Sequence, residues 1–276
     1  MIRFLLHTIF FSPNRHNNDC VLFAGRKGRS GETPTQRHSI HYHSLYDNKI
    51  LRKFRGHVDD VADISMCPAN DCFLTSSSDR TVRLWTLQEA GCLAQMELPT
   101  GAQGTPHAVY DSTGMVLGIT ASGSTEQYVH LYDARNYDSG AFAELKVPHS
   151  SIENVIQNQQ GAAELSKAEW SSIAFNASGN QLLATAPQGL ALLLDGFEGT
   201  VQKALCSEGA VSACFAADDK SVLMGNGDGT IGCWSVDSGK LLKKLPGHNG
   251  PVGCIASNPK YAMFASCCTS TALWLW

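Results

Sequence analysis

The chain has 276 residues, of which 43% are hydrophobic and 17% are charged, and 21 Lys and Arg against 25 Asp and Glu give a net charge of −4. This hydrophobic content excludes a disordered chain, and the slight acidic excess excludes a protein that binds nucleic acid through bulk positive charge. The sequence contains no run of about 18 apolar residues, so no transmembrane helix is predicted.

The N-terminal segment contains a short apolar run, from Phe4 to Phe11, that has the length of a signal-peptide core. Ser12-Pro13-Asn14-Arg15 follows it in place of a small-x-small cleavage pattern, so secretion is not expected. We expect residues 1–18 to lie outside the repeats described below and residues 19–276 to form one repeat domain.

The ten cysteines show no C-x-x-C spacing, so they do not predict a zinc site. Most lie in alternating apolar segments such as Ser212-Ala213-Cys214-Phe215, where a free cysteine acts as a small buried side chain. Disulfide frameworks are typical of shorter secreted chains, so reduced cysteines and a reducing compartment are expected.

Six short alternating segments recur along the chain, and each ends at an anchor residue. The anchors are His43, Trp85, Tyr132, Leu194, Trp234 and Trp274, at successive intervals of 42, 47, 62, 40 and 40 residues. A period of about 40–45 residues with four short strands per unit is typical of a β-propeller. The sequence therefore predicts an all-β propeller with six recognisable blades. The longest interval contains a polar insertion near 149–167, which predicts a surface loop with one helical turn.

The second unit combines Gly56-His57, Asp79 and Trp85. We expect the Asp79 carboxylate to accept hydrogen bonds from turn amides and from His57. His57 would bond onward to Thr75 or Ser77, and that hydroxyl would reach the Trp85 indole. Residues assigned to such structural networks are His57, Thr75, Ser77, Asp79, Trp85, Asp228, Trp234 and His248. No catalytic residue is predicted, because a nucleophile buried inside a blade cannot meet a substrate.

Three other motifs suggest ligands at first sight. His38, His41 and His43 form H-x-x-H-x-H, but no carboxylate or cysteine stands beside them in the sequence, so an ordinary strand and no metal site are expected. Arg26-Lys27-Gly28-Arg29 with Arg37 predicts a solvated basic hairpin tip, the alternative being contact with nucleic acid or an acidic tail. The glycine-rich stretch 225–229 precedes a strand, so it predicts a hairpin turn and no cofactor.

Gly56-His57, Asp79 and Leu84-Trp85 resemble the repeat motif of WD-repeat β-propellers. Longer segments resemble one family within them, the WD-repeat subunits of COMPASS-type histone lysine methyltransferase complexes. These segments are 44–49, 132–142, 248–251, 258–260 and 264–266, and the resemblance runs from about Asp19 to Leu275.

The resemblance implies a non-catalytic scaffold subunit of a nuclear chromatin-modifying complex linked to transcription. The implied partners are methyltransferase subunits, the phosphorylated tail of RNA polymerase, and phosphatase and RNA 3′-end-processing assemblies. It implies no cofactor, no membrane contact and no direct contact with nucleic acid.

The sequence also departs from the family, which has seven blades. Six anchors predict an N-terminally truncated, incomplete ring, with unpaired edges near residues 20–24 and near Leu273. Gln188 and Cys268 stand where Asp79 stands in the second unit, and Glu126 is a longer acid, so these blades are expected to lack the full network.

Tyr132-Asp133-Ala134-Arg135 resembles the W-D-x-R box with which some WD-repeat proteins dock on a cullin-RING ubiquitin ligase adaptor. Tyr132, Asp133 and Arg135 are therefore candidate partner-binding residues, and the alternative function is a substrate receptor of such a ligase. The other interpretation is that Arg135 caps the end of its blade.

Overall fold

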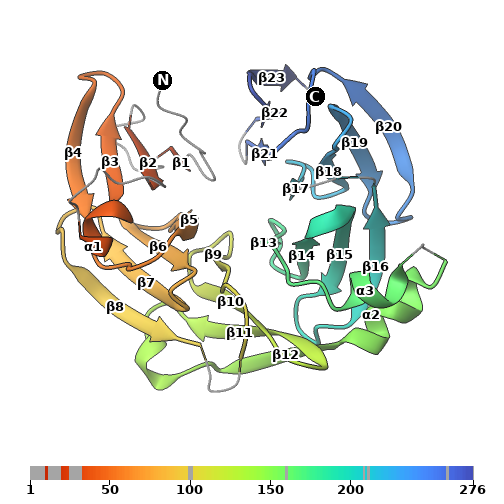
Figure 1. The fold of residues 1–276 in the computed structure, drawn as a ribbon, viewed down its shortest axis with the longest axis horizontal. Helices are drawn as coiled ribbons and strands as arrows, with labels where there is room; N and C mark the ends of the chain where they lie inside the picture. Colours follow the sequence, from red (N-terminus) through yellow and green to blue (C-terminus); the bar gives the residue numbers. More distant parts are fainter. Residues whose placement is uncertain are drawn as a thin grey trace. The chain divides into compact units, whose positions relative to one another are not determined.

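A computed structural model gives the structure of the chain and describes residues 10–11, 20–24, 33–98, 102–158, 161–207, 209, 212–258 and 261–275. The described strands form six sheets in which strand order follows the sequence (Figure 1). The first sheet contains β1 (Phe10–Phe11), β2 (Cys20–Ala24), β3 (Ile40–Ser44) and β4 (Lys49–Phe54), and the second contains β5 (Val61–Met66), β6 (Cys72–Ser77), β7 (Thr81–Thr86) and β8 (Cys92–Glu97).

Along the chain, the third sheet precedes the polar insertion and the fourth sheet follows it. The third contains β9 (Ala108–Tyr110), β10 (Val116–Ser122), β11 (Glu126–Asp133) and β12 (Ala143–Pro148), and the fourth contains β13 (Ser172–Phe175), β14 (Gln181–Ala186), β15 (Leu190–Asp195) and β16 (Val201–Cys206). The fifth contains β17 (Ser212–Phe215), β18 (Ser221–Gly225), β19 (Thr230–Ser235) and β20 (Leu241–Pro246), and the sixth contains β21 (Cys254–Ser257), β22 (Met263–Cys267) and β23 (Thr271–Leu275). This arrangement confirms the predicted all-β propeller with six blades.

Every predicted anchor lies on the third strand of its sheet, and in four sheets it marks the same irregularity. The register between the third and fourth strands shifts immediately before His43, Trp85, Leu194 and Trp234. In each case the anchor pairs with the residue seven positions later, namely Ile50, Cys92, Val201 and Leu241. A shift of this kind bends and twists the outer strand, so the sequence period reflects a repeated backbone feature.

Within each compact part of the chain, apolar clusters lie between neighbouring sheets. The second strands are the most buried, as in β18, where all five residues are buried, whereas the outer strand β8 alternates between half-buried and exposed residues. Between the first two sheets, Phe54 packs edge-on against Phe73 and Trp85, with ring centroids 4.9 and 5.8 Å apart. Between the fourth and fifth sheets, Leu193 and Met224 belong to one cluster.

The chain divides into two compact units. One unit runs to Ala121 and includes His130–Phe142, and the other contains Ser122–Val129 and the chain from Ala143 onward. The expected incomplete ring stays a prediction.

The first sheet differs from the expectation at its start. Phe10 pairs with Leu22 and Phe11 with Val21, so two of the residues expected outside the repeats form the first strand, β1. The prediction of an unpaired edge at residues 20–24 is wrong, because β2 has β1 on one side and β3 on the other. The remaining residues of the 1–18 segment lie outside the described part of the chain.

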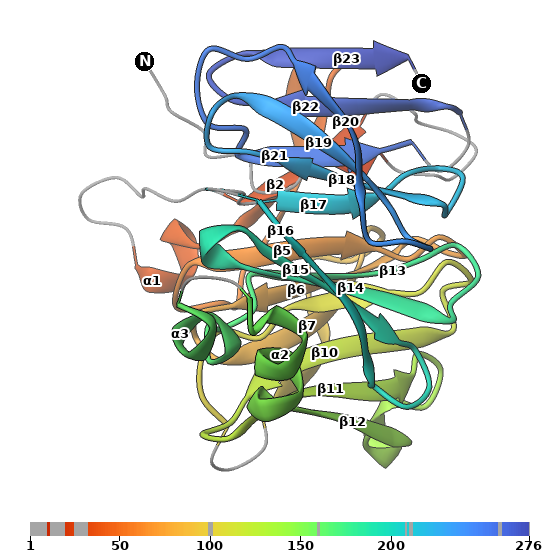
Figure 2. The same ribbon diagram turned by 90° about the vertical axis from the view of Figure 1, so that its right-hand side faces the viewer.

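The polar insertion holds two short helices, α2 (His149–Ile156) and α3 (Ala162–Ser166), where the sequence predicts a loop with one helical turn. Ile152 and Ile156 are buried and lie four residues apart, so they occupy one face of α2. This apolar face explains why a helix forms in a segment whose polar composition suggests a loop. α2 contacts β16 and α3 (Figure 2). Among the described helices, which also include α1 (Pro34–Arg37), none has the length and apolar character needed to cross a bilayer.

Candidate functional site

His57 is the centre of a hydrogen-bond chain inside the second sheet. Its Nδ1 lies 2.8 Å from Asp79 Oδ2, and its Nε2 lies 2.7 Å from Thr75 Oγ1. The Trp85 indole N–H donates to the same Thr75 oxygen at 2.8 Å. His57, Thr75 and Trp85 are fully buried. Of the two hydroxyls that the sequence offers, Thr75 is thus the one that links histidine to tryptophan, while Ser77 donates to the Asp59 carbonyl at 3.1 Å.

Asp79 occupies the turn between β6 and β7 and holds a nearly buried charge. Its carboxylate accepts hydrogen bonds from the backbone N–H groups of Val58 at 3.1 Å and Thr81 at 3.0 Å, and from the Thr81 hydroxyl at 2.7 Å. Burial by itself would raise the pKa of Asp79, but the hydrogen bonds from His57, Thr81 and Val58 outweigh it and hold that pKa well below its usual value. The turn therefore stabilises an anion.

The fifth sheet corrects one part of the predicted network. Asp228 accepts from the backbone N–H of Thr230 at 2.9 Å and from its hydroxyl at 2.6 Å. The Trp234 indole nitrogen, however, is buried and has no hydrogen-bond partner among the described residues. Met224 stands ten residues before Trp234, as Thr75 stands ten before Trp85, and a methionine has no hydroxyl to accept the indole N–H. Asp228 and Trp234 are thus not joined.

The sixth sheet keeps most of the chain that the second sheet shows. His248 Nε2 lies 2.6 Å from Ser266 Oγ, and the Trp274 indole N–H donates to that oxygen at 2.8 Å. His248 Nδ1 lies 3.1 Å from the sulfur of Cys268, which stands in the position of Asp79. The histidine, the hydroxyl and the tryptophan of the second sheet therefore have equivalents in the sixth sheet, and only the carboxylate is replaced, by the thiol of Cys268.

The glycine before each of these histidines has a packing reason. A Cβ atom at Gly56 would lie 3.0 Å from the Trp85 ring, and one at Gly247 would overlap the Trp274 ring. The Gly-His pair thus lets the tryptophan cover the backbone while the histidine reaches the hydroxyl.

The histidine pattern of the first sheet meets carboxylates that sequence spacing does not show. His38 Nδ1 lies 3.1 Å from Asp60 Oδ1, and single ligand atoms of His38, Asp59 and Asp60 all lie within 4.8 Å of one another. His41 contacts Ser39 and His43 contacts Asn48, so the three histidines have different partners. The sequence places no carboxylate beside the three histidines, but the fold brings Asp60 to His38 from 22 positions along the chain. The expectation that the histidines hold no metal stays a prediction.

We expect a chelator in excess to leave the melting temperature unchanged. The group at His38 offers three ligand atoms, Asp59 is exposed, and structural metal sites usually hold four ligands. Thermal melts with and without EDTA, together with elemental analysis of purified protein, test this expectation. Stoichiometric zinc that His38→Ala removes would contradict it.

Two loop motifs remain, the glycine-rich stretch 225–229 and the basic stretch 26–29. The stretch from Gly225 to Gly229 joins β18 to β19 as a hairpin turn, as the sequence predicts, and Gly229 adopts φ 84°, a conformation that favours glycine. Arg26-Lys27-Gly28-Arg29 lies outside the described residues.

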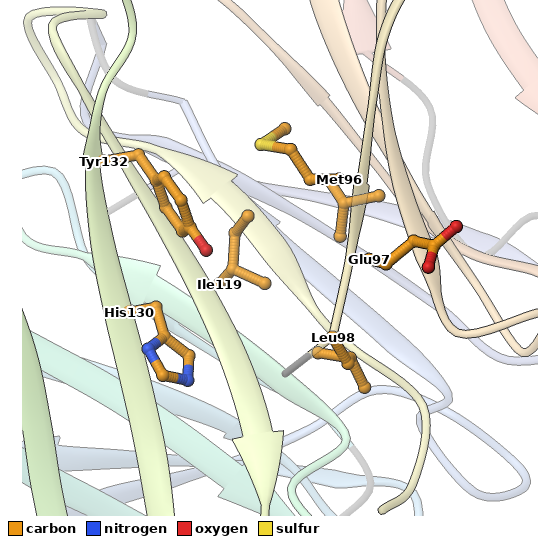
Figure 3. A pocket seen from close by; sticks show the side chains of 7 residues that line it. Met96, Glu97, Leu98, Ile119, His130 and Tyr132 are labelled. Atoms are coloured by element: carbon orange, nitrogen blue, oxygen red, sulfur yellow. The ribbon is translucent and has the colours of Figure 1, made fainter. Parts of the chain in front are cut away.

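The segment from Tyr132 to Arg135 ends β11, and its residues have separate environments. Tyr132 packs in the apolar cluster of the second and third sheets, where it lines a small pocket with Met96, Ile119 and His130 (Figure 3). Burial raises its pKa. Tyr132 is therefore a packing residue.

Asp133 and Arg135 form the charged part of this segment. The Arg135 backbone N–H donates to Asp133 Oδ1 at 2.8 Å, and the guanidinium Nε lies 3.4 Å from the same oxygen. The Arg135 side chain is 72% exposed and that of Asp133 is 41% exposed. A partner could therefore reach both groups.

Comparison with known proteins places these features in a family. Residues 48–86 and 239–276 match the WD40 family, described as WD domain, G-beta repeat. The chain is 34% identical over 243 residues to WD repeat-containing protein 82 of Drosophila melanogaster. The aligned region covers 86% of this chain and 70% of that protein. The chain belongs to the WD repeat-containing protein 82 family. The resemblance to WD-repeat propellers inferred from the sequence is confirmed.

Two further relatives of the WD repeat-containing protein 82 family carry informative names. COMPASS component SWD2 of Saccharomyces cerevisiae is 30% identical over 247 residues, covering 82% of this chain and 68% of that protein. Set1 complex component swd2 of Schizosaccharomyces pombe is 25% identical over 190 residues, and the aligned region covers 67% of this chain and 44% of that protein. The two segments that match the WD40 family contain the His57 and His248 chains, so the repeats with the clearest motif also have the most complete hydrogen bonding.

Proposed function

We propose that this protein is a non-catalytic scaffold subunit of a nuclear histone lysine methyltransferase complex linked to transcription. The observation that carries the proposal is the similarity to COMPASS component SWD2 over 82% of the chain. The internal chemistry agrees with a scaffold. In the second sheet, His57, Thr75 and Asp79 are hydrogen-bonded in one chain, and their side chains are almost fully buried, which keeps them from a substrate.

Exposed aromatic side chains supply candidate contact points for such a scaffold. Tyr46 is 85% exposed and Phe197 is 75% exposed, and each lies in the turn between the third and fourth strand, three residues after its anchor. Phe142 is also exposed and lies between β11 and β12. Aromatic residues dominate binding energy at protein interfaces, and rigid sheets fix the turns that present them. We infer that partners contact these turns.

Affinity purification from nuclear extract, read by mass spectrometry, tests the proposal. Methyltransferase subunits should co-purify with the wild-type chain, and Tyr46→Ala with Phe197→Ala should reduce their recovery severalfold, because each lost aromatic contact costs about 2 kcal/mol or more at a hot spot. Methyltransferase subunits missing from the wild-type purification would contradict the proposed function.

The second candidate, a substrate receptor of a cullin-RING ubiquitin ligase, rests on the exposed Arg135 at the end of β11. Under this alternative, ligase adaptor subunits would co-purify and Arg135→Ala would abolish their recovery. Lys146→Ala is the matched control, since Lys146 is also an exposed cation, 3.2 Å from an acid two residues away, Glu144. Under the scaffold proposal, neither variant changes recovery of the methyltransferase subunits.

A further inference from the structure

The turn that holds Asp79 recurs in the sixth sheet with a sulfur in place of the carboxylate. Asp79 and Asp228 each accept hydrogen bonds from the N–H and hydroxyl of the threonine two positions later. Cys268 Sγ lies 3.5 Å from the backbone nitrogen and 3.6 Å from the hydroxyl of Ser270, again two positions later. With His248 Nδ1 at 3.1 Å, the sulfur shares three kinds of contact with the Asp79 carboxylate: a histidine Nδ1, a backbone N–H and a hydroxyl.

Donors arranged for an anion favour the ionised form of the group that they surround. The hydrogen bonds from the Ser270 N–H and hydroxyl have the largest effect, and those from Thr269 and His248 have smaller ones. Together they lower the pKa of Cys268 to about 6. The neighbouring thiol behaves in the opposite way, because burial and the charge of Cys268 raise the pKa of Cys267. The titratable groups that face the Cys268 sulfur are thus His248 across the turn and Cys267 beside it.

The other described cysteines whose acidity is shifted are all made less acidic by burial. The pKa of Cys254 rises to about 11 and that of Cys214 to about 12. Cys268, in contrast, is half-buried and lies in a turn that continues with the exposed residues Thr269 and Ser270. Reactivity of a thiol depends on its thiolate fraction and on access, and Cys268 combines stabilisation of the thiolate with a side chain that is not fully buried.

We propose that Cys268 is the reactive thiol of this protein, the site at which hydroperoxides oxidise the chain and soft electrophiles alkylate it. With hydrogen peroxide, the thiolate sulfur attacks one peroxide oxygen, the S–O bond forms and the O–O bond breaks. The departing oxygen leaves as water with both peroxide protons, so that sulfur loses two electrons and a sulfenate remains.

Further oxidation leads to a product that fits the same turn. A second peroxide converts the sulfenate into a sulfinate and releases another water, so sulfur again loses two electrons. The sulfinate has two oxygens and one negative charge, as a carboxylate has. It can therefore accept hydrogen bonds from His248 and Ser270 as Asp79 accepts them from His57 and Thr81.

Competitive alkylation with limiting iodoacetamide tests the proposal, with the adjacent Cys267 as an internal control. At pH 7 we expect Cys268 to react roughly fivefold faster than Cys267, since its greater ionisation is partly offset by the lower nucleophilicity of a more acidic thiol. The rate at Cys268 should level off above pH 7 with a midpoint near 6, and the preference should vanish in denaturant. Equal labelling of the two cysteines in the folded protein would overturn the proposal.

Variants separate the contributions of the turn. Ser270→Ala removes one donor and should move the midpoint of Cys268 alkylation upward, while Ser238→Ala, in an exposed turn of the fifth sheet, should leave it in place. Cys268→Asp restores the carboxylate, so it should fold, melt no lower than the wild type and lose the oxidation that peroxide causes in this peptide. Peroxide that oxidises another cysteine first in the wild-type chain would contradict the proposal, whatever the variants do.

Discussion

Replacing His57 with alanine should lower the free energy of unfolding by about 1–3 kcal/mol, the cost of leaving buried polar groups without a partner. The Asp79 carboxylate, with 4% of its side chain exposed, would lose the imidazole that faces it at 2.8 Å. The Thr75 hydroxyl would keep the Trp85 indole but lose its other partner. Urea denaturation at pH 7, with an unchanged slope, measures the loss.

A matched substitution shows whether the network, and not the imidazole ring in general, is responsible. His43 occupies an anchor position on β3, and its half-buried ring contacts the Asn48 side chain and packs near Phe23, with no carboxylate depending on it, so His43→Ala should cost less than His57→Ala. His57→Ala with the same stability as the wild type would refute the network.

The pH dependence gives a second measurement of the same effect. The pKa of Asp79 is lower in the folded chain than in the unfolded chain, so its contribution to stability is present above about pH 4 and is lost as the pH falls below that value. The stability difference between wild type and His57→Ala should therefore shrink in acid, as Asp79 becomes protonated and no longer needs the imidazole.

The spacing of the anchors predicts the fold because each anchor marks a register shift that forms within a single blade. Trp85, Leu194 and Trp234 lie where the third strand shifts register against a fourth strand that starts within seven residues, and that contact is local in sequence. The same locality predicts the turn at Asp79, since Thr81 and Ser77 lie two residues from it.

Features without a local signature escaped prediction. β1 has two residues, too few to show a strand period, and only its pairing with Val21 and Leu22 reveals it. Asp60 meets His38 through the fold. Trp234 is different, because the sequence already shows Met224, which has no hydroxyl, at the position that Thr75 holds relative to Trp85. Cys268 carried a signal too, since its spacing of six residues from Trp274 is that of Asp79 from Trp85.

A protein made of residues 1–276 should self-associate through β23, the last described strand of the sixth sheet. Among the described strands β23 pairs with β22 alone, whereas the third strands of the five other sheets each have a fourth strand beside them. All five of those outer strands carry a charged residue, which discourages pairing with another sheet, while β23 (Thr-Ala-Leu-Trp-Leu) carries none. Leu273 is 74% and Leu275 is 89% exposed. An uncharged apolar edge of this kind is a template for a second strand.

Leu273→Lys combined with Leu275→Lys should weaken that self-association about tenfold, because like charges that face each other across paired strands repel and about 1.4 kcal/mol corresponds to that factor. Sedimentation at increasing protein concentration measures the change. Leu242→Lys is the matched control, since Leu242 is also an exposed leucine but its strand β20 already contains Lys243 and Lys244. A wild-type mass that does not change with concentration would show that the β23 edge is covered, and equal association of the double variant would place the contact elsewhere.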